Sequence, residues 1–324
     1  MLTDRFGRTI SYMRISVTDR CNLRCRYCMP DGIESLPMSD LLTYEEIAFV
    51  CRQAAGLGIG SVRITGGEPL VRKSCATLVA MLKGITGIRR VAMTTNGVLL
   101  GEYLDELLDA GLDAVNISLD TLDRGQYIAI TGRDELERVL DSIRLTAGKL
   151  PVRINCVICR GINDDAPESL VTLARDLPVD VRFIELMPIG AAKGLETVPN
   201  ASVLARIEER YGKTAEDPEV NGDGPAVYRR ADGFAGRIGF VSAMHGKFCS
   251  ACSRLRLTSI GELKPCLCYA DSVPIREILR DEEEGKEERI REKIREAVRL
   301  KPQAHCFEHI EQVTEDKKMV RIGG

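Results

Sequence analysis

Short apolar runs alternate with helical patterns along roughly the first 225 residues of this 324-residue chain. The apolar runs predict strands at residues 12–17, 61–65, 90–94, 113–118, 152–158 and 179–185. The stretches between them predict helices near residues 44–57, 71–85, 101–110, 134–147 and 167–175. Such alternation is typical of a parallel α/β sheet. Six strand–helix units, without a seventh and an eighth, favour a partial (β/α)6 barrel of the TIM type over the closed eight-stranded barrel.

The composition changes at residues 217–225, which read DPEVNGDGP. Gly, Pro, Asn and Asp at this density predict a turn-rich linker, so we place a domain boundary at residue 220. Residues 1–220 would form the barrel. Residues 221–324 would form a smaller α+β domain, with strands at 226–230, 237–241 and 254–258 and a charged helical region at 274–300.

The charge balance excludes one broad class of function. The chain has 45 Lys and Arg against 48 Asp and Glu, which argues against a generic nucleic-acid-binding protein but not against a local basic pocket. No apolar run approaches the ~18 residues that a membrane span needs. The first ten residues lack the basic and then apolar order of a signal peptide. We therefore expect a cytoplasmic protein that binds neither nucleic acid nor membrane.

Twelve cysteines are unexpected in a reducing compartment, where cysteines serve metal or redox chemistry more often than disulfides. Cys21, Cys25 and Cys28 have the spacing C-x3-C-x2-C and follow the first predicted strand. Three thiolates there could each bind one iron of a [4Fe–4S] cluster and leave the fourth iron open for another ligand. A structural zinc ion is the alternative, but it needs four ligands, and no fourth Cys or His lies nearby in the sequence.

A second triplet, Cys249, Cys252 and Cys266, has the spacing C-x2-C-x13-C in the C-terminal region. It again offers three ligands and not four. A zinc site completed by Cys268 or His245 is the alternative. Two incomplete triplets in one chain favour two open clusters over two defective zinc sites.

Polar residues recur on one face of the predicted strands, where side chains alternate with a period of two. If the other face packs on helices, the polar face lines the interior of the barrel. Buried arginines need anionic partners, and few carboxylates lie on the same faces. The pattern therefore favours a pocket for a polyanion such as a nucleoside triphosphate, held by guanidinium forks; internal ion pairs are the alternative. The arginines concerned are Arg14, Arg63, Arg153, Arg182, Arg254 and Arg256.

Three segments resemble those of a known family. Residues 19–30, DRCNLRCRYCMP, resemble the signature of the radical S-adenosylmethionine enzymes, and residues 63–70, RITGGEPL, resemble their GGEP element. Residues 248–267, FCSACSRLRLTSIGELKPCL, are similar to the second-cluster segment of the GTP 3′,8-cyclase branch, which acts in molybdenum cofactor biosynthesis. The terminal pair Gly323 and Gly324 fits that branch too, and the resemblance runs through the chain in order, without large gaps.

The resemblance implies one [4Fe–4S] cluster on each cysteine triplet. The first cluster would bind S-adenosylmethionine at its open iron and, after one-electron reduction, cleave it to methionine and a 5′-deoxyadenosyl radical. The second cluster would meet the guanine ring of GTP at its open iron. Positions that contact S-adenosylmethionine in the family are matched here by Tyr27, Gly67, Ser118 and Met187.

The implied reaction is the first step of molybdopterin biosynthesis. The radical would remove hydrogen from C3′ of the GTP ribose, and C3′ would attack C8 of guanine to give 3′,8-cyclo-7,8-dihydro-GTP. The implied catalytic set is the first triplet together with Arg254, Arg256, Gly323 and Gly324. Positions that contact GTP are matched by Arg14, Arg63, Thr94, Arg153, Arg182, Arg254, Leu255 and Arg256.

Two positions depart from the family pattern. Residue 153 is Arg where the family has Lys, which keeps the charge but changes the reach and the hydrogen-bond geometry. Ser61 stands where some members have Lys. Both departures concern the phosphate contacts and leave the reaction class unchanged.

The resemblance has further implications for the tail and for partners. The double-glycine tail would enter the active site, since glycine lets a backbone pass close to a ligand without a Cβ clash. The product would pass to the cyclic pyranopterin monophosphate synthase. Electrons would come from a donor such as flavodoxin or ferredoxin, and the enzyme would be a monomer or a homodimer.

Two other classes of function are weighed against this one. A peptide-modifying radical enzyme with an auxiliary cluster domain would have more cysteines in its C-terminal region than this chain has. An iron–sulfur sensor or electron carrier needs neither the GGEP element nor arginines in the barrel interior.

Overall fold

The computed structural model describes residues 1–32, 34–219, 222 and 224–323. These residues form a 12-stranded sheet in the order β12-β11-β10-β1-β2-β3-β4-β5-β6-β9-β8-β7. Each central strand is parallel to the next, which confirms the predicted α/β class. The central strands are β1 (Tyr12–Ser16), β2 (Ser61–Thr65), β3 (Arg90–Thr95), β4 (Ala114–Ser118), β5 (Val152–Ile158) and β6 (Val179–Glu185).

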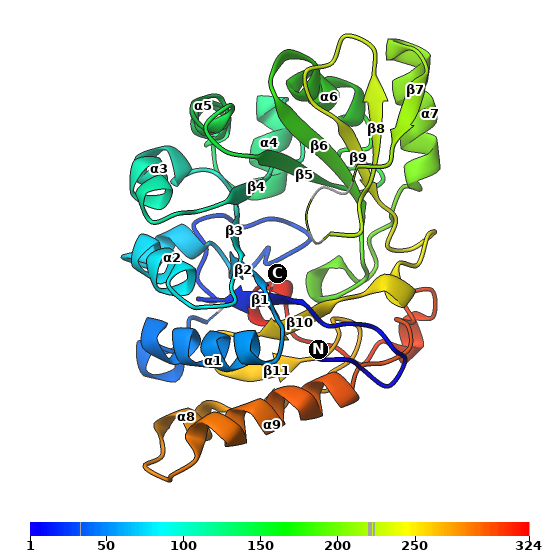
Figure 1. Ribbon diagram of the computed structural model, residues 1–324. Coiled ribbons are helices and arrows are strands. Elements are labelled where there is room, and N and C mark those ends of the chain that lie inside the picture. The colour runs from blue at the N-terminus through cyan, green and yellow to red at the C-terminus, as the bar shows by residue number, and fades with distance from the viewer. Residues whose placement is uncertain (33, 220–221, 223, 324) are drawn as a thin grey trace.

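The later strands extend this sheet at both edges (Figure 1). β9 lies parallel to β6, and β10 lies parallel to β1, so eight adjacent strands run in one direction. The remaining strands continue the sheet in antiparallel fashion. The added strands are β7 (Thr214–Asp217), β8 (Val227–Ala231), β9 (Ile238–Val241), β10 (Arg254–Leu257), β11 (Glu262–Lys264) and β12 (Val273–Pro274).

The predicted domain boundary at residue 220 lies outside the described residues. Strands on both sides of it belong to the same sheet, because β7 pairs with β8. The division into residues 1–220 and 221–324 stays a prediction.

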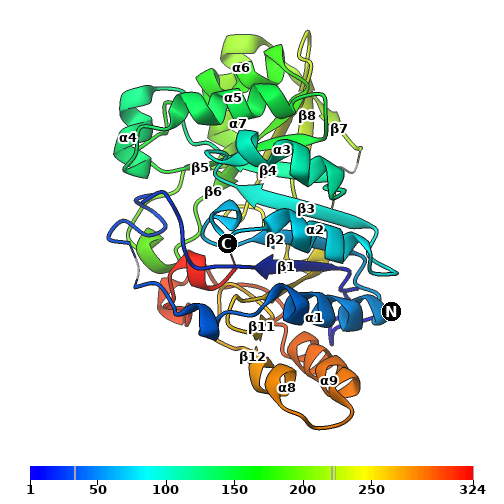
Figure 2. The ribbon, with the colours of Figure 1, turned by 90° about the vertical axis from the view of Figure 1, so that its left-hand side faces the viewer.

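Helices cover the outer side of the parallel strands (Figures 1 and 2). The five predicted helices of the barrel are present as α1 (Tyr44–Gly56), α2 (Cys75–Lys83), α3 (Leu100–Asp109), α5 (Leu136–Thr146) and α6 (Pro167–Asp176). The sequence pattern did not predict α4 (Arg124–Thr131) or α7 (Asn200–Tyr211). No helix in the described part of the chain is long and apolar enough to cross a lipid bilayer.

The charged region at residues 274–300 forms two helices, α8 (Arg276–Arg280) and α9 (Lys286–Arg299). Gly285 separates them with a φ of +73°, a left-handed conformation that favours glycine. α9 packs on the sheet through Ile290 and Ile294, which join Leu255 and Leu257 of β10 in the main hydrophobic core. The C-terminal strands and α9 therefore share the core of the barrel.

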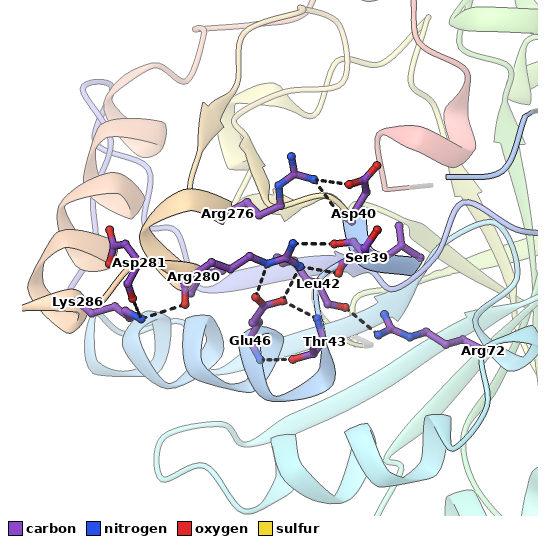
Figure 3. Close-up of polar contacts among 12 residues, drawn as sticks. Ser39, Asp40, Leu42, Thr43, Glu46, Arg72, Arg276, Arg280, Asp281 and Lys286 are labelled. Carbon is purple, nitrogen blue, oxygen red and sulfur yellow. Dashed lines mark hydrogen bonds and ion pairs between the residues drawn. The ribbon is translucent and has the colours of Figure 1, made fainter. Parts of the chain in front are cut away.

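α8 is fixed to the loop that follows the first cysteine triplet. Arg280 donates hydrogen bonds to the carbonyls of Ser39 and Leu41 and forms an ion pair with Glu46 at 2.8 Å (Figure 3). Glu46 also completes a capping box with Thr43 at the N-terminus of α1. This network joins the C-terminal region to the loop that precedes α1.

Candidate active site

A cavity of about 360 Å³ lies along the inner side of the sheet. Its wall contains all six cysteines of the two predicted triplets, which come from opposite ends of the sequence. The alternation along the strands directs their polar side chains into the same space. The strand residues in the wall include Arg14, Arg63, Thr94, Ser118, Asn155, Arg182, Arg254 and Arg256.

The first triplet lies on the loop after β1. The Sγ atom of Cys21 accepts hydrogen bonds from the N–H of Leu23 at 3.4 Å and from Nδ2 of Asn96 at 3.8 Å. Burial raises the pKa of Cys25 well above its usual value and that of Cys28 to about 12. Buried thiols of this kind ionise when a metal replaces the proton, so the all-thiol donor set fits an iron–sulfur cluster.

The GGEP element packs against that loop. A Cβ on Gly67 would lie 2.3 Å from the carbonyl oxygen of Arg20, so only glycine fits there. The N–H of Gly67 donates to the carbonyl of Thr18 at 2.8 Å. The next residue, Glu68, is fully buried and accepts the N–H of Asn96 at 2.6 Å. Burial raises the pKa of Glu68 to about 7.

The four residues matched to S-adenosylmethionine contacts, Tyr27, Gly67, Ser118 and Met187, all line the cavity. Tyr27 donates its hydroxyl hydrogen to Oδ2 of Asp120 at 2.6 Å. Burial raises the pKa of Asp120 to about 6. This hydrogen bond holds the phenol in the cavity wall, next to the first triplet.

The second triplet has a different electrostatic environment. Burial opposes ionisation of the Cys252 thiol, but the charges of Lys301 and Arg254 outweigh it and lower the pKa of Cys252. Burial raises the pKa of Cys266. The neighbouring cations therefore make the Cys252 thiol easier to ionise than an ordinary buried thiol.

The two residues that could complete a zinc site are engaged elsewhere. The Sγ atom of Cys268 lies 3.3 Å from that of Cys306, and Nδ1 of His245 lies 3.0 Å from Oε1 of Glu185. Neither Cys268 nor His245 lines the cavity. Across the described residues, no group of three His, Cys, Asp or Glu could hold a single metal ion. A cluster bonds each thiolate to a separate iron, so the triplets fit clusters better than zinc.

The arginines form a dense cationic wall. Arg14 pairs in register with Arg256 of β10 on one side and with Arg63 of β2 on the other. Burial, together with the neighbouring arginines, lowers the pKa of Arg14 and of Arg182 to about 10. The Nε atoms of Arg14 and Arg63 and the Oγ1 atom of Thr94 are buried without a hydrogen-bond partner. Opposed like charges and unsatisfied buried donors are both unfavourable, so this wall fits an anionic ligand.

The alternative of internal ion pairs does not hold for four of these arginines. Their guanidinium groups meet neutral partners: Arg182 donates to Oδ1 of Asn155 at 2.9 Å, and Arg254 lies 4.8 Å from the ring centre of Phe248. Within the described residues, no ion pair with a carboxylate is formed by Arg14, Arg63, Arg182 or Arg254.

Two predicted side chains, those of Arg153 and Leu255, do not line the cavity. Arg153 is buried beside Tyr228 and Arg63 and does not line the cavity. The side chain of Leu255 points into the hydrophobic core, since it lies on the opposite face of β10 from its two arginine neighbours, and its contact with GTP stays a prediction. Gly324 lies outside the described residues.

The C-terminal tail reaches the arginine wall, and both ribbon views place this segment beside β1 (Figures 1 and 2). The carbonyl of Gly323 accepts hydrogen bonds from Nη1 of Arg256 at 2.9 Å and from the Thr65 hydroxyl at 3.3 Å. The φ of Gly323 is +89°, which favours glycine. Ile322 is fully buried in a small apolar cluster that Met187 also contacts. The tail is thus anchored by apolar side chains, and its glycine meets the arginines.

Three residues of the site escaped the sequence analysis. Tyr12 shares the inward face of β1 with Arg14, a position that the period-two pattern could have given. Phe248 precedes the second triplet and stacks on Arg254. Lys301 lies against Cys252, and no motif marks it in the sequence.

Comparison with known proteins gives consistent matches. Residues 15–174 match the Radical SAM superfamily, and residues 179–307 match the family described as Molybdenum Cofactor Synthesis C. The chain is 45% identical to the GTP 3',8-cyclase of Moorella thermoacetica over 328 residues and 43% identical to that of Pelotomaculum thermopropionicum over 329 residues, in both cases across 100% of each chain. The fold is similar to that of Streptococcus suis SuiB bound to S-adenosylmethionine, with a TM-score of 0.66 at 15% identity over 97% of this chain and 78% of that one.

Proposed function

This chain belongs to the GTP 3′,8-cyclase family of radical S-adenosylmethionine enzymes, and we propose that its cavity converts GTP to 3′,8-cyclo-7,8-dihydro-GTP. That reaction is the first step of molybdenum cofactor biosynthesis. One observation carries the proposal: two thiol triplets meet a wall of arginines in a single cavity, and four of these arginines, Arg14, Arg63, Arg182 and Arg254, form no ion pair with a carboxylate among the described residues. The chemistry of a radical source and the recognition of a polyanion are thereby combined.

The first triplet would hold a [4Fe–4S] cluster, with S-adenosylmethionine against Tyr27, Gly67, Ser118 and Met187. When bound, this pair supplies a 5′-deoxyadenosyl radical after one-electron reduction. The protein's own contribution is positioning. The bare Cα of Gly67 lets the GGEP turn approach the triplet loop, and Asp120 holds the Tyr27 hydroxyl.

The arginine wall would bind the triphosphate of GTP. Guanidinium groups make forked, charge-assisted hydrogen bonds with phosphate oxygens. A bound triphosphate would also give partners to the buried Nε atoms of Arg14 and Arg63. The second triplet would hold the second cluster at the guanine end of the nucleotide, beside Arg254. Enclosure of the nucleotide would exclude water from a reactive radical.

The alternatives weighed from the sequence gain no support from the site. A redox carrier or sensor has no use for an arginine-lined cavity of about 360 Å³. A peptide-modifying activity has only the fold in its favour, since the similarity to SuiB is 15% in sequence.

We also propose three features that concern partners and location. The reductant would be a small carrier such as flavodoxin or ferredoxin, and the product would pass to the cyclic pyranopterin monophosphate synthase. The enzyme would act in the cytoplasm as a monomer or a homodimer.

The deciding experiment is anaerobic reconstitution followed by product analysis. Reconstituted protein with two [4Fe–4S] clusters should hold about eight irons and about eight sulfides per chain. With S-adenosylmethionine, a reductant and GTP, it should form the cyclised nucleotide, whereas ATP in place of GTP serves as the control. Changing Cys21, Cys25 and Cys28 together to Ala should halve the iron and abolish cleavage of S-adenosylmethionine. Stoichiometric zinc without iron would overturn the proposal.

Substitution of single arginines tests the GTP contacts separately. Arg254→Ala or Arg256→Ala should weaken GTP binding by roughly 1.5–3 kcal/mol, about one to two decades in affinity, because a charge-assisted contact is lost. Cleavage of S-adenosylmethionine without GTP should persist. Arg144→Ala, on the exposed side of α5, is the matched control. Unchanged GTP affinity in both variants would mean that these arginines serve only the protein's own structure.

A further inference from the structure

Lys301 lies just after α9, and its ammonium group is buried against the second cysteine triplet. The residue is 2% exposed. Its Nζ donates hydrogen bonds to the carbonyl oxygens of Arg254 at 2.7 Å and Pro265 at 2.9 Å, and it lies 3.8 Å from Sγ of Cys252. Lys301 therefore connects the two stretches of chain that carry the triplet.

No carboxylate among the described residues lies within ion-pair distance of this ammonium. The charged groups around it are the cations Arg8 and Arg254, and the ionisable thiols are Cys252 and Cys266. A buried cation without an anion is strongly unfavourable. The site is incomplete without a negative charge on the side of the thiols.

A second buried lysine nearby shows the usual arrangement. Lys264 of β11 forms an ion pair with Glu315, and the two side chains are 0% and 2% exposed. The chain thus supplies a carboxylate to one buried lysine of this region and none to the other. The two lysines differ in their surroundings: Lys264 lies beside the carboxylate of Glu315, whereas Lys301 lies beside the cysteine triplet.

We propose that Lys301 is the counter-charge of the second cluster: its ammonium donates an N–H···S hydrogen bond to the Cys252 thiolate and raises the cluster's reduction potential. The inference rests on the second cluster of the proposed function. Net charge and hydrogen bonds to the sulfurs are among the factors that set the potential of such a cluster. Reduction adds one electron from the external donor, so the reduced state is more negative, and a fixed neighbouring cation stabilises it more than the oxidised state.

The same cation also holds the carbonyl of Arg254, a residue that lines the cavity. Loss of Lys301 would therefore disturb the cluster and the start of β10 together. A purely structural role would alter folding and iron content whether or not the substitute keeps the positive charge, and it would not shift the potential of the cluster that remains. The potential is thus the readout that separates a counter-charge from a structural support.

The test uses anaerobically reconstituted full-length protein in which Cys21, Cys25 and Cys28 are Ala, so that only the second cluster reports. Lys301→Met is compared with this parent by redox titration followed by electron paramagnetic resonance. We expect the equilibrium constant for reduction to fall at least tenfold, a shift of 59 mV to lower potential for a one-electron couple. Lys301→Arg, which keeps the cation, should shift less. Lys293→Met, on the partly exposed side of α9, is the matched control.

Each outcome decides one point. An unchanged midpoint in Lys301→Met, with the cluster present, overturns the inference and leaves the proposed function intact. Loss of iron in Lys301→Met but not in Lys301→Arg supports it, because the cation is then needed to hold the cluster. Loss of iron in both variants overturns it, because the site then needs the shape of lysine and not its charge. A parent that holds no iron contradicts the second cluster itself.

Discussion

Arg14 of β1 and Arg256 of β10 occupy the same register position on adjacent parallel strands. Arg63 of β2 stands at the same level on the other side of Arg14. Burial and mutual repulsion lower the pKa of Arg14 to about 10 and that of Arg256 well below its usual value. Arg14 and Arg63 form no ion pair with a carboxylate among the described residues, so the repulsion between these neighbouring guanidinium groups lowers the stability of the sheet when no anion is bound. Such a conflict between stability and local charge is typical of a ligand site.

This conflict predicts opposite effects of Arg14→Met on stability and on binding. The apoprotein should become more heat-stable, by up to about 1 kcal/mol, because one member of the opposed like charges is removed. GTP affinity should fall at least tenfold, because a charge-assisted contact is lost. Differential scanning calorimetry and equilibrium binding measure the two effects, with Arg14→Lys as the control that keeps the charge. A less stable apoprotein would instead assign Arg14 a structural role.

The buried Glu68 predicts a pH dependence of stability. Burial raises its pKa from 4.5 to about 7 in the folded protein, so between these pH values the folded state holds a proton that the unfolded state has released. Stability from this group is therefore present below about pH 4.5 and is lost as the pH rises towards 7, a change of up to about 3 kcal/mol. Glu68→Gln should flatten this part of the curve, measured as urea midpoints of the apoprotein from pH 5 to 8. Burial also raises the pKa of Asp120, so Asp120 makes stability fall with rising pH in the unaltered protein and in Glu68→Gln alike. If the urea midpoint changes with pH equally in the unaltered protein and in Glu68→Gln, the pKa of Glu68 is not raised.

The strands of the barrel could be predicted from the sequence because two patterns mark them: alternation of polar and apolar residues, and turn residues at their ends. In β2 and β5 the period of two separates arginines from apolar residues, and turn residues mark the ends. The predicted bounds of β2, β5 and β6 agree with the structure. Helix α4 was missed because it has only eight residues, and its start depends on an N-terminal cap from the Asp123 side chain.

Long-range pairing was beyond the sequence. Nothing local indicates that Arg254 and Arg256 lie on a strand parallel to β1, because this pairing joins residues far apart in the chain. The three-residue β11 is too short for a periodic signal, and it carries Lys264, whose partner Glu315 lies in the tail. Lys301 belongs to no sequence motif, and only the structure shows that its ammonium group lies beside Cys252.

The buried pair Lys264 and Glu315 predicts a large loss of stability from a small change. Glu315→Gln leaves the Lys264 ammonium buried without its carboxylate, which should lower the free energy of unfolding by about 3–5 kcal/mol. Denaturant unfolding measures it. Glu262→Gln is the matched control, because it breaks an exposed ion pair with Lys317 and should cost less than about 1 kcal/mol. The double change of Lys264 to Met and Glu315 to Leu should recover much of the loss, and failure to do so would mean that the pair itself is net stabilising.

The tail predicts a separation of chemistry from folding. Ile322 is fully buried in its apolar cluster, whereas Gly323 contributes mainly a carbonyl to Arg256 and Thr65. Deletion of residues 323 and 324 therefore removes little apolar contact and should leave cluster content, thermal stability and cleavage of S-adenosylmethionine nearly intact. Formation of the cyclised nucleotide should fall by orders of magnitude, because Arg256 loses the contact that orients it towards the cavity.

The two products of the reaction make this prediction measurable in one assay. In the truncated enzyme, 5′-deoxyadenosine should still accumulate while the cyclised nucleotide does not, so the ratio of the two reports coupling and not folding. The peptide VRIGG added in trans should restore part of the cyclisation, because it supplies the missing carbonyl without altering the chain. Gly323→Ala should have a smaller effect, since it keeps the carbonyl but strains a backbone held at a φ of +89°, at a cost of about 1 kcal/mol. A truncated enzyme that cyclises GTP at the full-length rate would show that the contact between Gly323 and Arg256 has no part in the chemistry.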